Sequence, residues 1–515
     1  MFYRHKERGR QMKKTKNLIT DFINSVEPEF QAPLEEFFIN LQERTELTEK
    51  DTIQLINDFY HAFLYYRQNG VDLSVALERL DLANMGGFYA REAKQWFPLD
   101  HSAKIYPLAL GYNQMAMFRV SAYLKEPVVP EILQIALTFS IKRFPQFATT
   151  LKKGFFWHYL DSRKGHYAIE EETAKPFEPI RVSLTNSRTF KVLYYQNRIS
   201  VEIFHALTDG TGGIVFLKTL IREYLRLLGV HSNPDETTLD INVPTLSEEN
   251  VNEFENIEKT ETSGLMNKKA LQMSGKLTRV KPSQIIHFKM DTQKLLATAR
   301  RRNTTITGYI GALNLMAMKY ATESLSGELS IQVPVNMRKF YPSLTLRNFS
   351  MYFSLRLPIE DIKSKTETIE IVNGQLKENS TKEKMTEMAY STKNLVHKIR
   401  FIPLAVKRPI AKQIYGFLGE RAYTSTLSNL GVISFAPELT EHIESLDFVL
   451  GPNNINRTSV TLITFENVTT LSITKSTNDP AFEESLLALL EADQIPVEIE
   501  GSELYESKKH LSTRK

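Results

Sequence analysis

The sequence predicts a mixed α/β (α+β) protein of two lobes, preceded by an α-helical appendage. Apolar residues recur at helical spacing through residues 18–94, whereas mixed strand and helix patterns begin near residue 106. A segment rich in Asn, Glu, Thr and Ser, residues 232–275, has the composition of a mobile linker and divides those patterns into two halves. We therefore expect an appendage over 1–94, a first lobe over 95–231, a linker or crossover over 232–282, a second lobe over 283–502 and a tail over 503–515.

The appendage is predicted to consist of helices. Ile53, Ile56, Phe59 and Phe63 lie on one helical face, and the pattern ends near Asn69-Gly70, a typical helix stop. No acid–base constellation stands out in this region. We expect it to serve packing, docking or oligomerisation, to contribute nothing to chemistry, and to cover the surface of the second lobe.

The first lobe should contain two strands joined by a tight turn and followed by a helix. Before them we expect a strand, a helix and a second strand. The predicted strands are 114–123, 155–161, 191–195 and 199–204, and the predicted helices are 130–144 and 214–228.

The second lobe repeats the mixture of strands and helices. The predicted strands are 284–290, 329–335, 350–357, 459–465 and 468–475, and the predicted helices are 292–302 and 307–321, the latter opened by Thr304 or Thr305. Residues 393–421 alternate apolar and basic positions. We expect their apolar side to pack on the lobe, because Pro403 and Pro409 interrupt any long helix; a membrane-surface helix is the alternative.

Composition excludes several classes of protein. The 515 residues carry 64 basic and 60 acidic side chains, a net charge of +4, which argues against a dedicated nucleic-acid binder. There is no cysteine, so disulfides, thiolate metal sites and a cysteine nucleophile are excluded. The histidines show no metal-ligand spacing, and no apolar run approaches the roughly 20 residues of a membrane helix. We expect a cytoplasmic protein with no metal and no transmembrane segment.

The most informative segment is 205–210, which reads H-x-x-x-D-G. It places His205 at the end of a predicted strand, in a Gly-rich loop before a helix. Histidine titrates near neutral pH, so His205 could act as a general base where a ligand can reach it. A turn of this kind also favours Asp and Gly for structural reasons, and a satisfied polar histidine remains the alternative.

Two further segments follow H-x-x-x-D-G along the chain, and their order relative to it is informative. Residues 331–338 read I-Q-V-P-V-N-M-R, with R-N-F-S-M-Y-F at 347–353, and residues 426–432 read T-L-S-N-L-G-V. Together with H-x-x-x-D-G they resemble the superfamily of chloramphenicol acetyltransferase, the condensation domains of non-ribosomal peptide synthesis and the alcohol acyltransferases. The bacterial alcohol acetyltransferase-like proteins are the most similar branch, and the resemblance runs from about Trp96 to about Ile499.

The resemblance implies a two-lobed chloramphenicol acetyltransferase-like fold with a central tunnel. An acyl group, with acetyl as the expected one, would pass from acyl-coenzyme A to a hydroxyl or amine acceptor, with His205 as the general base. Asp209 would pair with Arg338 to hold the loop, with Gly210 in the turn, rather than form a dyad with His205. Acyl-coenzyme A would be a co-substrate, and no tightly bound cofactor is implied.

The resemblance also points to residues that would bind the oxyanion or the substrate. Ser428 and Asn429 match best, followed by Thr426; their alternative is a turn before Gly431. Tyr352 matches a position that lines the acceptor channel, although an aromatic residue on a strand is usually part of the core.

Two alternatives stay open for the function. The chain could be a non-catalytic binding or docking member of the same fold, or a carrier-protein-dependent acyltransferase of a biosynthetic cluster. His205, Asp209 and Arg338 occur together, which favours the enzyme. Phe204 stands where the condensation and wax-ester branches usually carry an additional His, which argues against those two roles. The acceptor, the acyl length and the oligomeric state stay open.

Overall fold

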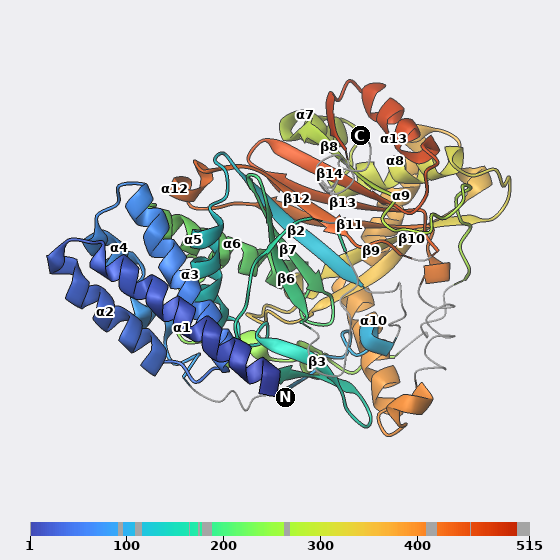
Figure 1. The fold of residues 1–515 in the computed structure, drawn as a ribbon. Helices are drawn as coiled ribbons and strands as arrows, with labels where there is room; N and C mark the ends of the chain where they lie inside the picture. The colour runs from blue at the N-terminus through green and yellow to red at the C-terminus, as the bar shows by residue number, and fades with distance from the viewer. Residues whose placement is uncertain are drawn as a thin grey trace.

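The computed structural model describes residues 2–90, 96–108, 116–163, 165–173, 176–177, 188–261, 268–407, 420–453 and 455–501. In this part of the chain the strands form three sheets, flanked by helices (Figure 1). Their strand orders are β12-β2-β7-β6-β5, β10-β9-β11-β13-β14-β8-β15 and β1-β4-β3. The mixed α/β class is therefore confirmed. The expected tail, residues 503–515, lies outside the described residues.

The five-stranded sheet forms the centre of the first lobe. Its strands are β2 (Met117–Leu124), β5 (Glu170–Glu171), β6 (Phe190–Tyr195), β7 (Arg198–Phe204) and β12 (Ile443–Leu450). Four of these strands come from the first half of the chain, whereas β12 comes from the second half and pairs antiparallel with β2. The two lobes are therefore not contiguous in the sequence.

The seven-stranded sheet forms the centre of the second lobe. It contains β8 (Gln284–Asp291), β9 (Glu328–Asn336), β10 (Ser350–Pro358), β11 (Ser425–Ile433), β13 (Thr458–Phe465), β14 (Val468–Lys475) and β15 (Val497–Glu500). The predicted hairpin is present, as β13 and β14 pair over their full length. The hydroxyl of Thr474 donates to the carbonyl of Leu450 at 2.8 Å, so this sheet meets the first one along β12.

Helices cover the outer faces of the two large sheets. α6 (Gly210–Leu228) packs on the first sheet, and α5 (Pro130–Ser140) packs beside α6. The second lobe carries α7 (Thr292–Arg301), α8 (Ile306–Tyr320), α9 (Lys365–Asn379), α10 (Lys382–Lys398) and α13 (Ala481–Glu491). The short helix α12 (Pro437–Thr440) packs on β12 of the first sheet. Thr305 caps α8, one of the two residues expected to do so.

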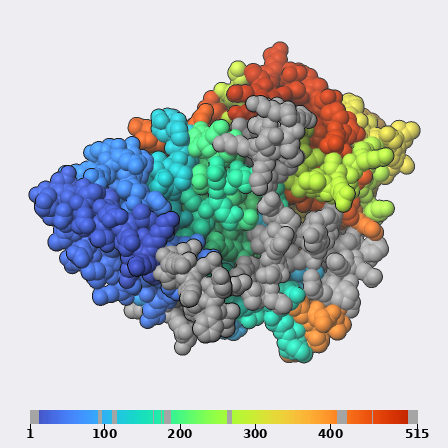
Figure 2. All heavy atoms as spheres, in the orientation of Figure 1, coloured from blue at the N-terminus to red at the C-terminus, as the bar shows by residue number. Residues whose placement is uncertain are grey.

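The N-terminal helices pack on the first lobe. They are α1 (Phe2–Asn24), α2 (Pro28–Glu43), α3 (Glu49–Gln68) and α4 (Leu73–Arg79), seen as the blue flank in Figures 1 and 2. Phe59 of α3 lies 5.9 Å from Phe139 of α5, and the Tyr66 hydroxyl donates to the carbonyl of Leu227 in α6 at 2.7 Å. The expectation that these helices cover the second lobe is wrong, since their apolar faces join the core of the first.

The small sheet corrects one predicted strand. In place of a strand over 155–161, the chain forms a hairpin of β3 (Thr149–Lys153) and β4 (His158–Ser162), and β1 (Trp96–Pro98) pairs with β4. Gly154, Phe155 and Phe156 lie in the turn, where two exposed aromatic side chains gave a misleading strand pattern.

The Asn- and Glu-rich segment is not a free linker in its described part. Glu249 is buried and accepts two hydrogen bonds from Arg143 of the first lobe, at 2.5 and 2.6 Å. Phe254, a few residues on, is buried in the core of the second lobe. A buried ion pair and a buried aromatic side chain therefore tie this polar segment to both lobes.

The expected packing of residues 393–421 is met only in part, since Val396 and Leu404 are buried whereas Phe401 and Val406 are exposed. The helix α10 overlaps this region at 393–398, and its apolar side packs on the lobe. Met385, Ala389 and Val396 are buried, and the helix ends at Lys398. Residues 408–419 of this alternating region lie outside the described residues. None of the helices within the described ranges combines the length and the apolar composition of a membrane span.

Candidate functional site

His205 lies where the first lobe meets the second. β7 ends at Phe204, and α6 begins at Gly210, so five residues form the connection. The amide N–H of His205 donates to the carbonyl of Ala116 at 2.8 Å, which extends the β2–β7 ladder by one residue. The histidine is thus attached to a rigid strand although it stands at the start of a loop.

Two aromatic rings hold the imidazole of His205. Tyr106 stacks on it with a centroid distance of 4.9 Å and an interplanar angle of 26°. Phe118 meets it edge-on at 5.2 Å. His205 as a whole is partly exposed.

Asn348 forms two hydrogen bonds with His205. Its amide nitrogen donates to the carbonyl oxygen of His205 at 2.7 Å, and its amide oxygen lies 2.8 Å from Nδ1 of the ring. A carbonyl oxygen can only accept, so the first bond fixes which end of the Asn348 amide faces the ring. Nδ1 must then carry the proton, and in the neutral ring Nε2 carries the lone pair.

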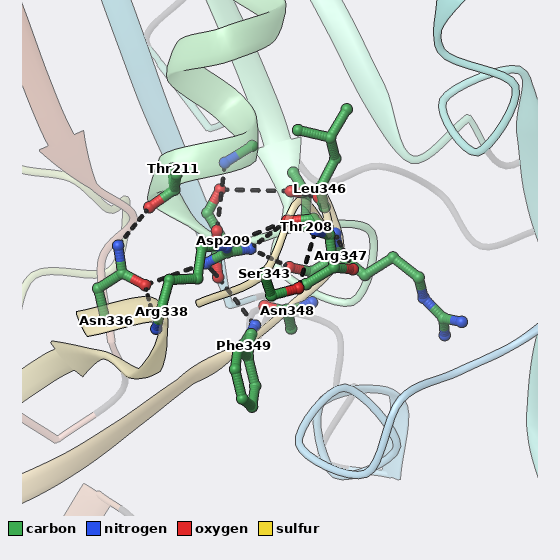
Figure 3. Close-up of polar contacts among 12 residues, drawn as sticks. Thr208, Asp209, Thr211, Asn336, Arg338, Ser343, Leu346, Arg347, Asn348 and Phe349 are labelled. Atoms are coloured by element: carbon green, nitrogen blue, oxygen red, sulfur yellow. Dashed lines mark hydrogen bonds and ion pairs between the residues drawn. The ribbon is translucent and has the colours of Figure 1, made fainter. Parts of the chain in front are cut away.

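Asp209 and Arg338 form the expected ion pair (Figure 3). The Arg338 guanidinium donates to Oδ2 of Asp209 at 2.7 Å, and the same oxygen accepts from the backbone N–H of Phe349 at 2.8 Å. Oδ1 of Asp209 caps α6 by accepting from the N–H of Gly212 at 3.2 Å. Neither oxygen bonds to the His205 ring, so Asp209 is a clamp and not a dyad partner.

Arg338 extends this clamp to the loop between β9 and β10. Its guanidinium also donates to the carbonyl oxygens of Thr345, at 2.7 and 3.0 Å, and Arg347, at 2.7 Å. Thr208 donates to the carbonyl of Leu346 in the same loop. The bonded residues lie on both sides of Asn348 in the sequence. The bonds therefore hold the backbone of Asn348 opposite the His205 loop (Figure 3).

Glycine is needed where the two loops approach most closely. A Cβ at Gly212 would lie 2.1 Å from the Thr208 hydroxyl and 2.4 Å from the Leu346 carbonyl oxygen. At Gly210 a Cβ would lie 2.6 Å from Cδ2 of Leu430, a flexible side chain on β11. Residues 210–213 belong to α6, so the predicted helix start at Ile214 was late because its glycines suggested a loop.

The predicted oxyanion residues lie on β11, next to the start of α6. The Thr426 hydroxyl donates to the side chain of Gln332 at 3.3 Å. Asn429 donates to Thr307 at 3.0 Å and accepts from the N–H of Gly431 at 2.7 Å, which is the turn role considered for it. The Ser428 hydroxyl has no hydrogen-bond partner within the described ranges, and Ser428 is 8% exposed.

Tyr352 lies on β10 beside Tyr423, with their rings edge to face at 5.9 Å. Burial raises the pKa of its hydroxyl, and the hydrogen bond to Tyr423 opposes that shift. Tyr352 is therefore packed against Tyr423 within the lobe but stays partly exposed.

Sequence reasoning gave no role to Asn348, Tyr106 or Asp100. Asn348 was visible beside Arg347 in the R-N-F-S segment, but its contact with His205 depends on a loop from the other lobe. Burial raises the pKa of Asp100, and the Arg347 charge, 4.0 Å away, opposes that shift. Within the described ranges, no group of three or more metal-ligand side chains lies together.

Known proteins were compared with the chain. No protein-family model and no curated protein matches its sequence. Among solved structures, polyketide synthase associated protein 5 from Mycobacterium tuberculosis is 14% identical and has a TM-score of 0.51, covering 76% of this chain and 96% of its own. The chain has the two-lobed condensation-domain and chloramphenicol acetyltransferase-like fold.

Two fungal structures share this fold. Trichothecene 15-O-acetyltransferase TRI3 from Fusarium sporotrichioides is 11% identical with a TM-score of 0.51, covering 77% of this chain and 94% of its own. F. graminearum TRI101, complexed with coenzyme A and deoxynivalenol, is 11% identical with a TM-score of 0.51, covering 78% and 99%. At such low identity the likeness concerns the fold alone.

Proposed function

We propose that the chain is an acyltransferase, and that it moves an acetyl or other acyl group from acyl-coenzyme A to a hydroxyl or amine acceptor. His205 is the general base. The observation that carries this proposal is the pair of hydrogen bonds from Asn348, which leaves the lone pair of the neutral imidazole on Nε2. A ring that is stacked, fixed in one tautomer and part of a residue that is partly exposed suits proton transfer to Nε2.

The reaction follows from that tautomer. The acceptor O–H or N–H gives its proton to Nε2 as the acceptor oxygen or nitrogen attacks the thioester carbonyl carbon. The tetrahedral intermediate collapses by breaking the carbon–sulfur bond, and the proton on Nε2 passes to the leaving thiolate. The products are the ester or amide and free coenzyme A. Nδ1 keeps its proton throughout, held by Asn348.

Ser428 is the proposed donor to the oxyanion. Its hydroxyl is uncommitted among the described residues, whereas the side chains of Asn429 and Thr426 already have partners. One oxyanion donor is typically worth ~10²–10³ in kcat. Tyr352 is assigned to the wall of the acceptor side, without a chemical step.

Asp209, Gly210 and Arg338 support the site and take no part in proton transfer. The clamp holds the loop that carries Asn348 against the loop that carries His205. A docking module with no chemistry would gain nothing from fixing one histidine tautomer, so the geometry favours the enzyme. Donation from a carrier protein is the second candidate, and the donor in the assay decides between the two.

The test is release of free thiol from acetyl-coenzyme A with a panel of alcohols and amines. His205→Ala is expected to lower kcat by at least ~10² in a protein that still folds. Ser428→Ala should lower kcat more than Thr426→Val, the matched change on the same strand. A folded His205→Ala chain that turns over at the wild-type rate refutes the general-base role. Activity with an acylated carrier protein but not with acyl-coenzyme A selects the second candidate.

A further inference from the structure

Aromatic side chains from both lobes meet on one exposed surface. Phe155 and Phe156 occupy the turn of the β3–β4 hairpin, and they are 73% and 37% exposed. Phe401, which follows α10, is 70% exposed, and its ring lies 6.1 Å from that of Phe156. Val406 is 50% exposed on the same segment. We call these four residues the aromatic surface; Figures 1 and 2 show the hairpin (turquoise) and the segment after α10 (orange) side by side at the lower edge.

The aromatic surface is held together by hydrogen bonds and is not a pair of loose loops. The N–H of Leu404 donates to the carbonyl of Phe155 at 2.8 Å. The Lys407 ammonium donates to the carbonyl of Phe156 at 2.9 Å. Because both bonds join the two segments, the exposed rings keep a fixed relative position. Exposed apolar groups that are clustered and fixed mark an interaction site more often than scattered ones do.

The residues around the aromatic surface are basic. Residues 150–160 and 393–407 contain six Lys and Arg side chains and no Asp or Glu: Lys152, Lys153, Lys393, Lys398, Arg400 and Lys407. Lys152 and Lys393 are neutralised by Asp161 and Glu255. The other four form no ion pair with any carboxylate in the described ranges. Lys407 is buried, whereas Lys153, Lys398 and Arg400 are exposed, so these three give the surface uncompensated positive charge.

Two ammonium groups share the ring of Trp157 beneath the aromatic surface. Lys407 lies 3.3 Å and Lys104 lies 5.6 Å from its centroid. Desolvation, and to a lesser extent the charge of Lys104, lower the pKa of Lys407 to about 8. Asp100 and Glu255 act on Lys104 only through longer-range attraction. An anion placed here would relieve the repulsion between the two lysines.

We propose that the aromatic surface binds the surface of an anionic lipid bilayer. Aromatic side chains ringed by Lys and Arg suit the boundary between headgroups and acyl chains. Each basic group near an anionic bilayer strengthens binding about fivefold. The contact requires no membrane-spanning helix. It uses Phe401 and Val406, which lie in the region 393–421 that the sequence offered as a membrane-surface helix, but through the segment after α10, since α10 turns its apolar side inward.

The location of the surface relates it to the candidate site. Lys104 stands two residues before Tyr106, which stacks on His205. The same short segment therefore borders both features. Bilayer binding is independent of the proposed acyl transfer, and it can be measured on the full chain without any substrate.

The experiment is co-sedimentation of the full chain with vesicles of phosphatidylcholine alone, or of an equimolar mixture of phosphatidylcholine and phosphatidylglycerol. We expect binding to the anionic vesicles, weakened by salt, and little binding to the neutral ones.

Phe155→Ala with Phe401→Ala should weaken binding at least about tenfold. Lys153→Glu with Arg400→Glu should abolish it. Tyr320→Ala with Leu325→Ala removes comparably exposed side chains elsewhere, 63% and 90% exposed, and should leave binding unchanged.

A fluorescence readout gives an independent check on the location of binding. The chain has two Trp residues, so Trp96→Phe leaves Trp157 alone, and its emission should shift to shorter wavelength on anionic vesicles. Absence of binding overturns the proposal, and so does binding that the two aromatic substitutions leave intact. If the substitutions instead lower the mass of the protein in solution, the surface is an interface between two copies and the lipid proposal is wrong.

Discussion

Replacing Asn348 tests whether the tautomer of His205 is set by the second lobe. Asn348→Leu keeps the approximate shape of the side chain but removes both bonds to His205, at 2.7 and 2.8 Å. One hydrogen bond makes a net contribution of ~0.5–1.5 kcal/mol to stability, so the two bonds together stabilise the position of the ring by ~1–3 kcal/mol. At 1.36 kcal/mol per factor of ten, we expect kcat to fall about 5–150-fold. A histidine locked in the wrong tautomer would lose up to ~10⁴.

Asn348→Asp separates a chemical role from a structural one. A carboxylate still accepts from Nδ1–H and keeps the lone pair on Nε2, but it cannot donate to the carbonyl of His205. Its negative charge stabilises the protonated imidazole, so the acid limb of the pH–rate profile should move to higher pH while activity at alkaline pH partly recovers. A residue that only filled space would not move this profile.

The assay is the pH dependence of kcat and KM for thiol release, with thermal melting of each variant. Because Asn348 is buried and bonds to Nδ1 of the ring and not to Nε2, KM should stay near the wild-type value. Ser343→Ala is the matched control, because it removes two hydrogen bonds from the same loop, one to Glu253 and one from the N–H of Thr345, but none to His205. A folded Asn348→Leu protein with wild-type kcat and an unchanged pH profile would refute the assignment.

Two further predictions concern stability. Asp209→Asn strands the charge of Arg338 in a largely buried setting, at a cost on the order of 3–5 kcal/mol, so melting temperature and activity should fall together; an unchanged melting temperature contradicts the clamp. Phe59→Ala, at the contact of α3 with Phe139, should destabilise the first lobe by ~3–5 kcal/mol, because the appendage shares its core. If the melting curve is unaffected, the helical appendage is an independent unit.

Sequence patterns correctly predicted the features that depend on interactions between neighbouring residues. The two-strand hairpin before His205, the hairpin β13–β14 and the cap at Thr305 all depend on residues close in sequence, and all are present. The His205 loop was recognisable because H-x-x-x-D-G combines a strand end, a helix cap and a turn within six residues. The Asp209–Arg338 pair was expected only from the resemblance, since the two residues are far apart in the chain.

Contacts between distant segments could not be predicted from pattern. Strand β12 joins the sheet of the first lobe although it lies in the second half of the chain, and nothing in its own residues indicates that partner. The packing of the N-terminal helices on α5 and α6 is of the same kind, because an apolar stripe shows that a helix needs a partner and not which one. Asn348 was missed for this reason too, since its role arises only where the two loops meet.

A substitution at Gly212 tests how the two lobes bring His205 and Asn348 together, because the absence of a side chain there permits the close approach of the two loops. The first turn of α6 must approach the loop 345–349 closely enough for Thr208 and Asp209 to bond to it. Gly212→Ala would put a methyl group 2.1 Å from the Thr208 hydroxyl and 2.4 Å from the carbonyl oxygen of Leu346, where backbone and a short side chain leave little room to move. The loop should therefore shift away from His205 and weaken the bonds that Asn348 makes, so kcat should fall by a factor similar to that of Asn348→Leu.

Combining both substitutions distinguishes the causes: if Gly212→Ala acts through Asn348, the double variant should be little slower than the slower single variant. Effects on kcat that multiply would show that Gly212 acts by another route.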